Sequence, residues 1–279
     1  MQPITYHMTH LTLVANDEAQ MRPFYRDILG FVETKIDAQT YSYALTTAQP
    51  PILTLVFNGT APSAPRQGLY HFALLFPDTA SLASLVAHLL TINYPLGGGD
   101  HDVSEAFYLN DPNGNGIELY HDRPREQWQW DQNFVQMGTK AVDVATLLQA
   151  RKSNWVGFPS QTTIGHLHFV GHNVAAGDAF FIDGLGMALT TTFANSANFY
   201  SHNRYHHHHA YNTWLGARVA QRQPQENGLT DWTITVNPAY FAQLKTRFAD
   251  RGQLIDVHTL TVIDPFGSTL IIHETADET

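Results

Sequence analysis

The sequence predicts an α+β fold of four βαβββ modules arranged as two tandem domains with curved mixed sheets. Segments in which apolar and polar residues alternate, as is typical of strands, are separated by segments whose apolar residues recur at helical spacing. The order of a strand, a helix and further strands recurs along the chain, and the chain repeats itself at an offset of about 155 residues. We expect domains over residues 1–123 and 164–279, joined by a linker over residues 124–163.

The repeat indicates an internal duplication. Four segments of the first half return in the second half, in the same order and at nearly constant spacing, which chance rarely produces. The pairs are His10 to Leu13 with His166 to Phe169, Phe24 to Phe31 with Phe180 to Met187, Gly68 to Phe72 with Gly228 to Trp232, and Asp111 to Gly114 with Asp264 to Gly267.

Each half divides into two modules. In the first module a strand over 9–15 precedes a helix that Asn16 or Asp17 caps and Gly30 ends, and short β-rich runs follow over 40–57. The second module has a strand over 69–76, a helix opened by Pro77-Asp78, and strands up to Tyr120. The remaining helices are expected near 174–184 and 238–250, and a short linker helix near 141–150. We expect the linker to pack against the domains, because exposed tryptophans such as Trp128 and Trp130 are costly.

The stretch from Gly97 to His121 predicts a hairpin that places a carboxylate among apolar residues. A turn over 111–116 separates a strand ending after Tyr108 from a returning strand over 117–120. Because side chains alternate along a strand, Glu118 shares a face with Tyr120 and lies opposite Ile117 and Leu119. A buried carboxylate needs a partner that stabilises its charge. The alternative is that Glu118 is not buried and lies at the solvent-exposed end of the strand.

Composition excludes several classes of protein. The chain has 279 residues, 43% of them hydrophobic, and no cysteine, so disulfides and catalytic thiols are excluded. A net charge of −10 argues against a nucleic-acid partner. We expect a cytoplasmic protein with no membrane partner, because no apolar run is long enough to span a bilayer. The 16 histidines favour metal binding or acid–base chemistry, although surface histidines are common.

Three side chains are candidate metal ligands. If the two modules of the first half close into one curved sheet, His10, His71 and Glu118 meet on its concave face. Two imidazoles and one carboxylate form the facial set that binds a divalent non-haem iron and leaves coordination positions open. Taken by itself, each of the three residues can instead be an ordinary polar side chain, either buried or on the surface.

The sequence resembles the vicinal oxygen chelate superfamily, and in particular its two-domain extradiol ring-cleaving dioxygenases of the catechol 2,3-dioxygenase type. The resemblance covers nearly the whole chain and is strongest over 99–108, the turn through Gly116, Glu118, and Tyr205 to His208 with Asn212 and Trp214. It implies an Fe²⁺ site at the positions that match His10, His71 and Glu118. It also implies that Tyr108 and His101 assist the reaction of a small aromatic diol with O₂. Tyr108 lies ten residues before Glu118.

The second half departs from the pattern of that family. The place of His71 is taken by Asp231, that of Glu118 by Ile271, and that of Tyr108 by Thr261. Isoleucine cannot bind a metal, so we expect the site in the first half and a degenerate copy in the second.

A histidine run, His206 to His209, lies inside the second half. If it forms a strand, His206 and His208 share one face with Asn212. Together with His166 and His168, these residues form a second polar cluster, which suits a second metal site, a substrate pocket or a hydrogen-bonded plug. We favour a plug or an interface.

The leading hypothesis is an iron-dependent extradiol dioxygenase. The alternatives are a glyoxalase-like lyase or isomerase that uses Zn²⁺, Ni²⁺ or Mn²⁺, and a non-catalytic protein that sequesters a small molecule or confers resistance. A glyoxalase-like site usually needs a fourth protein ligand, and Leu53 to Val56 offer no strong one. Mn²⁺ also remains an alternative metal for the dioxygenase, and the hypothesis allows for a homo-oligomer.

Overall fold

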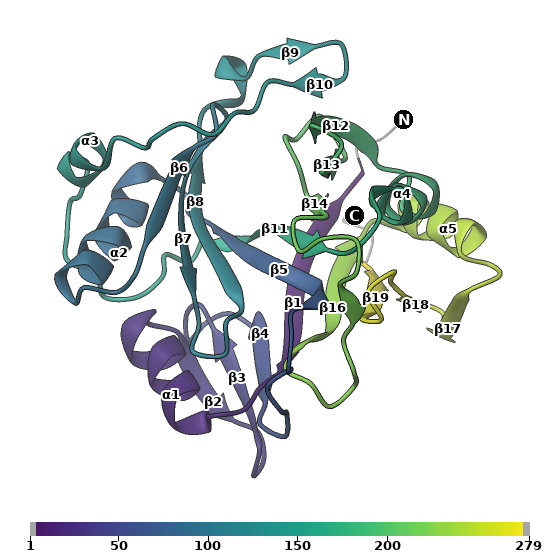
Figure 1. Ribbon diagram of the computed structural model, residues 1–279, viewed down its shortest axis with the longest axis horizontal. Helices are drawn as coiled ribbons and strands as arrows, with labels where there is room; N and C mark the ends of the chain where they lie inside the picture. Colours follow the sequence, from purple (N-terminus) through teal and green to yellow (C-terminus); the bar gives the residue numbers. More distant parts are fainter. Residues whose placement is uncertain (1–3, 276–279) are drawn as a thin grey trace.

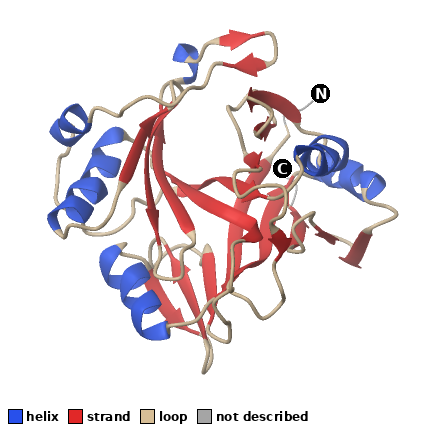
Figure 2. Cartoon of the chain, viewed as in Figure 1, coloured by secondary structure: helices blue, strands red, loops and turns tan. Residues whose placement is uncertain are grey.

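A computed structural model describes residues 4–275, and its elements repeat one order four times: a strand, a helix and three strands (Figures 1 and 2). The first module consists of β1 (Tyr6–Val14), α1 (Glu18–Pro23) continued by the π-helix η1 (Phe24–Ile28), β2 (Val32–Lys35), β3 (Thr40–Ala44) and β4 (Leu53–Val56). The second consists of β5 (Arg66–Leu75), α2 (Thr79–Thr91), β6 (Gly97–Asp100), β7 (Ser104–Asn110) and β8 (Gly116–Asp122).

The second half follows the same plan. Its third module consists of β11 (Thr163–Val170), α4 (Val174–Asp178) continued by the π-helix η3 (Ala179–Gly184), β12 (Ala188–Phe193), β13 (Ala197–Ser201) and β14 (His209–Asn212). The fourth consists of β16 (Gly228–Val236), α5 (Pro238–Arg247), β17 (Gly252–Asp256), β18 (Thr259–Ile263) and β19 (Thr269–Glu274). The expected α+β fold with curved mixed sheets is confirmed.

The modules pair across the two halves, not within them. Strand β1 pairs antiparallel with β16, so the first module joins the fourth in the order β2-β3-β4-β1-β16-β19-β18-β17. Strand β5 pairs antiparallel with β11, so the second module joins the third in the order β6-β7-β8-β5-β11-β14-β13-β12. Met8 on β1 and Ile164 on β11 connect these two curved parts. With the short strand β15 (Ala220–Gln221), which pairs with β5, they form one 17-stranded sheet. The assumption that the two modules of one half share a curved sheet is therefore wrong.

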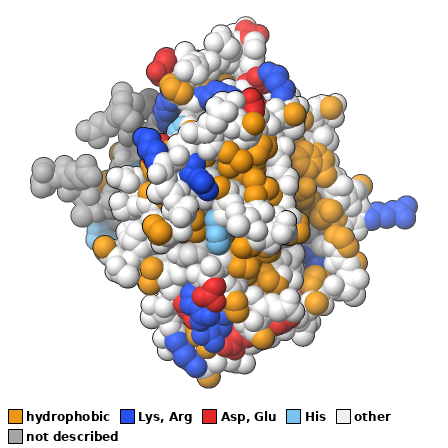
Figure 3. Space-filling model, turned by 90° about the vertical axis from the view of Figure 1, so that its left-hand side faces the viewer, with side chains coloured by type: hydrophobic (Ala, Val, Ile, Leu, Met, Phe, Trp, Pro, Cys, Tyr) orange, Lys and Arg blue, Asp and Glu red, His pale blue; other side chains and the backbone are white. Residues whose placement is uncertain are grey.

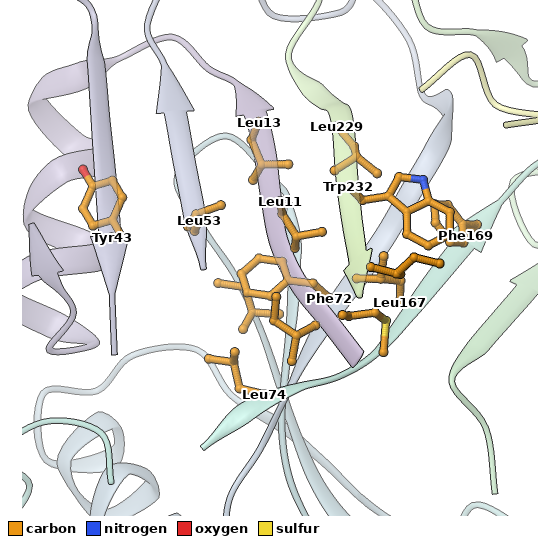
Figure 4. Close-up of a cluster of buried hydrophobic side chains, with 14 of the residues drawn as sticks. Leu11, Leu13, Tyr43, Leu53, Phe72, Leu74, Leu167, Phe169, Leu229 and Trp232 are labelled. Atoms are coloured by element: carbon orange, nitrogen blue, oxygen red, sulfur yellow. The ribbon is translucent and has the colours of Figure 1, made fainter. Parts of the chain in front are cut away.

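The core lies where the first strands of the four modules come together (Figure 4). On each strand the residues on one face are apolar and fully buried, because side chains alternate along a strand. Leu11 and Leu13 come from β1, Phe72 and Leu74 from β5, and Leu167 and Phe169 from β11. Leu229 and Trp232 come from β16, where a shift in its pairing with β1 lets residues three apart share this face. The opposite faces of these strands are left for polar side chains.

The predicted helix caps and turns are confirmed. The side chains of Asp17 and Asp78 accept hydrogen bonds from backbone amides in the first turns of α1 and α2. Asp111 opens the β7–β8 turn, and its Oδ1 accepts from the backbone amides of Asn113 and Asn115. Asp264 does the same in the β18–β19 turn for Phe266 and Ser268. The repeated Asp-Pro motif therefore forms the same turn twice.

The segment between the halves packs against them, as expected. It contains η2 (Arg125–Gln127), the two-stranded pair β9 (Trp130–Asp131) and β10 (Phe134–Val135), and helix α3 (Val144–Gln149). Trp128 is buried against Tyr205. The face that carries α1, α2 and α3 has acidic and basic side chains in small mixed clusters, without a broad basic area among its coloured residues (Figure 3). Within residues 4–275, no helix has the length and hydropathy needed to cross a bilayer.

Candidate metal centre

His71, Glu118 and His166 bring three ligand atoms together in the interior. Oε2 of Glu118 lies 3.0 Å from Nε2 of His71 and 3.1 Å from Nε2 of His166. The two imidazole nitrogens are 3.3 Å apart. All three residues are buried, and no other group of three such residues converges in this way within the described part of the chain.

Strand alternation explains why these side chains face one another. Each ligand lies next to a core residue: His71 precedes Phe72 on β5, Glu118 lies between Ile117 and Leu119 on β8, and His166 precedes Leu167 on β11. Strand β5 pairs with both β8 and β11, so the three ligands come from three adjacent strands.

Gly116 and Ala73 provide the space that this arrangement needs. A methyl group at Gly116 would lie 2.3 Å from the Tyr70 carbonyl oxygen and 2.9 Å from His71 Cβ. Ala73 is the cross-strand neighbour of Glu118 and is fully buried. Small residues therefore let β8 approach β5 closely at the ligands.

His10 does not join this group, so the predicted convergence of His10 with His71 and Glu118 is wrong. Its Nε2 lies 2.9 Å from Thr54 Oγ1 in the other curved part of the sheet, because β1 pairs with β16 and β4. His166 is the repeat counterpart of His10 and takes the expected position. The site thus draws on both halves of the chain, not on the first half alone.

The counterpart of the site lies in the part of the sheet that β1 and β16 form. Its members are His10 on β1, Asp231 on β16 and Ile271 on β19. Asp231 accepts hydrogen bonds from Thr12 and Thr230. Among the described residues, no group of three potential ligands forms there.

The electrostatics of the cluster favour an ionised Glu118 and a neutral His71. Burial opposes ionisation of Glu118, but the charges and hydrogen bonds of His166 and His71 outweigh it and hold the pKa of Glu118 well below its usual range. Burial lowers the pKa of His71, although Glu118 acts in the opposite direction. Glu118 and His71 are therefore in the protonation states that a metal ion requires of its ligands.

The residues present fit a divalent ion. Ligands at right angles and about 2.1 Å from an ion lie about 3.0 Å from one another, close to the three separations measured here. Nδ1 of His166 is buried and has no hydrogen-bond partner within residues 4–275. Two imidazoles and one carboxylate match the facial set used by non-haem iron.

His101 and Tyr108, the predicted catalytic residues, are in contact beside the cluster. His101 Nδ1 donates to the carbonyl of Gly138 at 2.8 Å, so Nε2 of the neutral ring accepts from the Tyr108 hydroxyl at 2.7 Å. Tyr108 is the cross-strand partner of Glu118, and its ring lies 5.7 Å from that of His71. Burial, and then the Glu118 charge, raise the pKa of Tyr108 well above its usual value.

A cavity of about 640 Å³ opens onto this cluster. Its wall includes the three candidate ligands and Tyr108 and His101, together with residues of the second half: His168, His207, Phe199 and Trp214. The Trp214 ring is half exposed and packs edge-on against Tyr70. The cavity is large enough for a small aromatic ligand.

The predicted second polar cluster does not exist as one group. His166 belongs to the metal candidate, and His168 Nε2 bonds the amide of Asn212 at 2.9 Å. His206 Nε2 bonds Asp122 at 2.8 Å, while His208 Nδ1 bonds Ser201 at 2.9 Å. The predicted strand alternation fails because only His209 of the run lies within a strand.

Sequence reasoning missed two residues of the site. His166 is the repeat counterpart of His10, but the sequence places it in the half expected to be degenerate, because no local pattern shows which modules pair. His207 was visible in the histidine run, yet nothing in the sequence distinguished it from its neighbours. It lies in the loop between β13 and β14, whose path no local pattern specifies.

The comparisons with known proteins agree with the fold. The sequence model of the Glyoxalase/Bleomycin resistance protein/Dioxygenase superfamily matches residues 7–119. A catechol-2,3-dioxygenase of Bacillus subtilis (strain 168) is 37% identical over 238 residues, which is 82% of each chain.

Two solved structures share the arrangement. A putative dioxygenase from Bacillus subtilis subsp. subtilis str. 168 has a TM-score of 0.62 at 12% identity, over 96% of this chain and 84% of that chain. Glyoxalase I from Zea mays has a TM-score of 0.55 at 13% identity, over 97% of this chain and 93% of that chain. At these identities the likeness concerns the fold alone.

Proposed function

Because the chain belongs to the Glyoxalase/Bleomycin resistance protein/Dioxygenase superfamily, we propose that it is an extradiol dioxygenase that opens a catechol-like ring with O₂. The observation that carries this proposal is the convergence of His71, Glu118 and His166 at the base of a cavity. The 37% identity to a relative named catechol-2,3-dioxygenase supports the choice of reaction within a superfamily of varied activities.

In this proposal His71, Glu118 and His166 hold one Fe²⁺ ion. Three protein ligands on one side of an ion leave positions for both hydroxyl oxygens of a diol and for dioxygen. When bound, the iron supplies the redox chemistry that joins a diol and dioxygen. One aromatic diol and one O₂ give one open-chain product, so the balance needs no further oxidant or reductant.

Tyr108 and His101 then bind and orient the diol. The Tyr108 hydroxyl, which donates to His101 Nε2, lies on the strand beside Glu118 and can also accept a hydrogen bond from a diol hydroxyl. A proton that leaves the diol can reach His101 Nε2 through this hydroxyl, while His101 Nδ1 stays bonded to Gly138. Positioned proton-transfer groups typically supply about 10²- to 10⁴-fold in rate.

In this proposal the second half of the chain forms part of the active site. It supplies the ligand His166 and the cavity wall formed by His168, Phe199 and Trp214. Aromatic side chains exclude water from the ring of the diol and stack against it. The second half therefore shapes the substrate site and completes the metal site.

Anaerobic loading with Fe²⁺ tests the reaction directly. The loaded protein is mixed with catechol and then with air, and the yellow ring-fission product is followed by absorbance. Glu118→Ala, which removes the carboxylate, is the matched control and should give no product. Mn²⁺, loaded in the same way, tests the alternative metal.

Other outcomes would contradict the proposal. Turnover of a hemithioacetal with Zn²⁺ or Ni²⁺, without ring fission, would indicate a glyoxalase-like lyase or isomerase. Tight catechol binding without any product at full metal occupancy would indicate a sequestering protein.

A further inference from the structure

A chain of hydrogen bonds lies behind His207, a histidine in the cavity wall. Nδ1 of His207 lies 2.7 Å from Nδ1 of His206, and Nε2 of His206 lies 2.8 Å from Oδ1 of Asp122. His206 is fully buried, and the side chain of Asp122 is 20% exposed. The chain thus connects the cavity with a carboxylate at the end of β8, the strand that carries Glu118.

Asp122 determines which nitrogens of the two rings carry protons. An ionised carboxylate only accepts hydrogen bonds, so Nε2 of His206 is the donor. Nδ1 of a neutral His206 then has no proton and accepts from Nδ1 of His207. A neutral His207 is left with an unprotonated Nε2.

Nε2 of His207 is open to the cavity. It has no hydrogen-bond partner in residues 4–275, and it is not among the polar atoms sealed from solvent there. His207 itself is 9% exposed and lines the cavity. Its ring centroid lies 4.1 Å from that of the candidate ligand His166. A hydrogen-bond acceptor of the cavity wall is therefore held on a ring beside the candidate ligand His166, without a donor from residues 4–275.

We propose that Asp122 and His206 are positioning residues that hold His207 Nε2 as an acceptor for a hydroxyl group of the bound ligand. The proposal rests on the proposed function for the identity of that ligand, an aromatic diol. His206 cannot reach the ligand itself, because both of its ring nitrogens are engaged within the protein. Asp122 acts only through His206.

His168, another histidine of the cavity wall, offers a hydrogen-bond donor instead of an acceptor. The backbone amide of Trp214 donates to Oδ1 of Asn212 at 2.9 Å, which turns the Asn212 amide nitrogen toward Nε2 of His168. A neutral His168 therefore carries its proton on Nδ1. One histidine of the cavity wall therefore offers an acceptor and the other a donor.

Nitrogen-15 NMR of protein labelled at histidine measures the tautomer without any turnover. In the metal-free unmodified protein, His207 should show a protonated Nδ1 and an unprotonated Nε2, with His207→Gln used for assignment. Asp122→Lys places a donor where the acceptor stood and should invert both tautomers. A proton on Nε2 of His207 in the unmodified protein would overturn the proposal, and so would an unchanged tautomer in a folded Asp122→Lys protein.

Binding of 4-nitrocatechol to the zinc-loaded protein measures how the tautomer of His207 changes the affinity for a catechol. Asp122→Lys should raise the dissociation constant about 10-fold, the effect of one lost hydrogen bond. Asp250→Lys makes the same charge change at an exposed position after α5, outside this chain of hydrogen bonds and the cavity wall, and should change the dissociation constant less than about 2-fold. An inverted tautomer with unchanged affinity would overturn the role of His207 as the ligand acceptor.

The two measurements separate this proposal from the proposed function. The NMR experiment needs neither metal nor dioxygen, and zinc-loaded protein binds a catechol without opening it. A protein with the expected tautomer and affinity change but no ring fission would uphold the positioning role and contradict the reaction.

Discussion

Nε2 of His166 lies 3.1 Å from Oε2 of Glu118, although the two residues belong to different halves of the chain. They meet because β5 pairs with both β8, which carries Glu118, and β11, which carries His166. The pairing of the second module with the third therefore builds the candidate metal centre.

His166→Ala should weaken Fe²⁺ binding by at least about 100-fold, because removing a ligand costs no less than removing a residue that orients one. His10→Ala is the matched control, since His10 occupies the same repeat position and bonds Thr54 instead. Calorimetric titration with Fe²⁺ under anaerobic conditions measures both affinities. Equal losses in the two variants would mean that the cluster is not the metal site.

Tyr108→Phe should keep the metal and lower kcat by about 10²-fold, because it removes the hydroxyl between His101 and the proposed diol. Tyr94→Phe is the control: its hydroxyl bonds the carbonyl of Asn110 and is not part of the cavity wall. Steady-state kinetics with matched iron content compare the two variants. A Tyr108→Phe enzyme with unchanged kcat would leave Tyr108 as a packing residue only.

Asp111→Ala should reduce the free energy of unfolding by about 3 kcal/mol, because it leaves the buried Tyr25 hydroxyl and two part-buried amides of the β7–β8 turn without an acceptor. It should also weaken Fe²⁺ binding, since this turn aligns Glu118 with Tyr108. Asp264→Ala removes the same support from the β18–β19 turn, where no candidate ligand lies. Denaturant titration and calorimetry should show similar destabilisation in both variants and a metal effect in Asp111→Ala alone.

His202 should make the protein less stable in acid. Burial, and then the charge of Arg247, lower the pKa of His202 to about 4, whereas an unfolded chain has about 6.5. The stabilisation is therefore complete above pH 6.5 and is lost as the pH falls through 4, with a total of about 3 kcal/mol.

His202→Gln removes this titration while keeping a donor for the Tyr240 hydroxyl, which His202 Nε2 bonds at 2.8 Å. Urea unfolding at pH 7 and pH 4 should show a smaller loss of stability for this variant than for the unmodified protein. Equal losses would show that other groups cause the acid sensitivity.

Much of the fold could be predicted from the sequence, because local signals specify local structure. Alternation around Leu11 and Phe72 indicated the buried strands, and Asp17 and Asp78 marked the starts of helices. The Asp-Pro turns were visible twice because the same side-chain hydrogen bonds shape both. These features depend on neighbours within a few residues.

The pairing of modules could not be predicted in the same way. Alternation shows that His10 and His166 face away from the core, but it does not show which strand lies beside them. Four similar modules can pair within each half or across the halves with the same apolar faces buried. The choice depends on long-range register, such as Leu167 opposite Phe72, which no local pattern contains.

Anomalous diffraction at the iron edge, from crystals grown anaerobically with Fe²⁺, tests the central claim most directly. The account predicts one strong peak within bonding distance of His71 Nε2, Glu118 Oε2 and His166 Nε2. A peak beside His10, a peak among His206 to His208, or no peak at the cluster in iron-saturated crystals would contradict it.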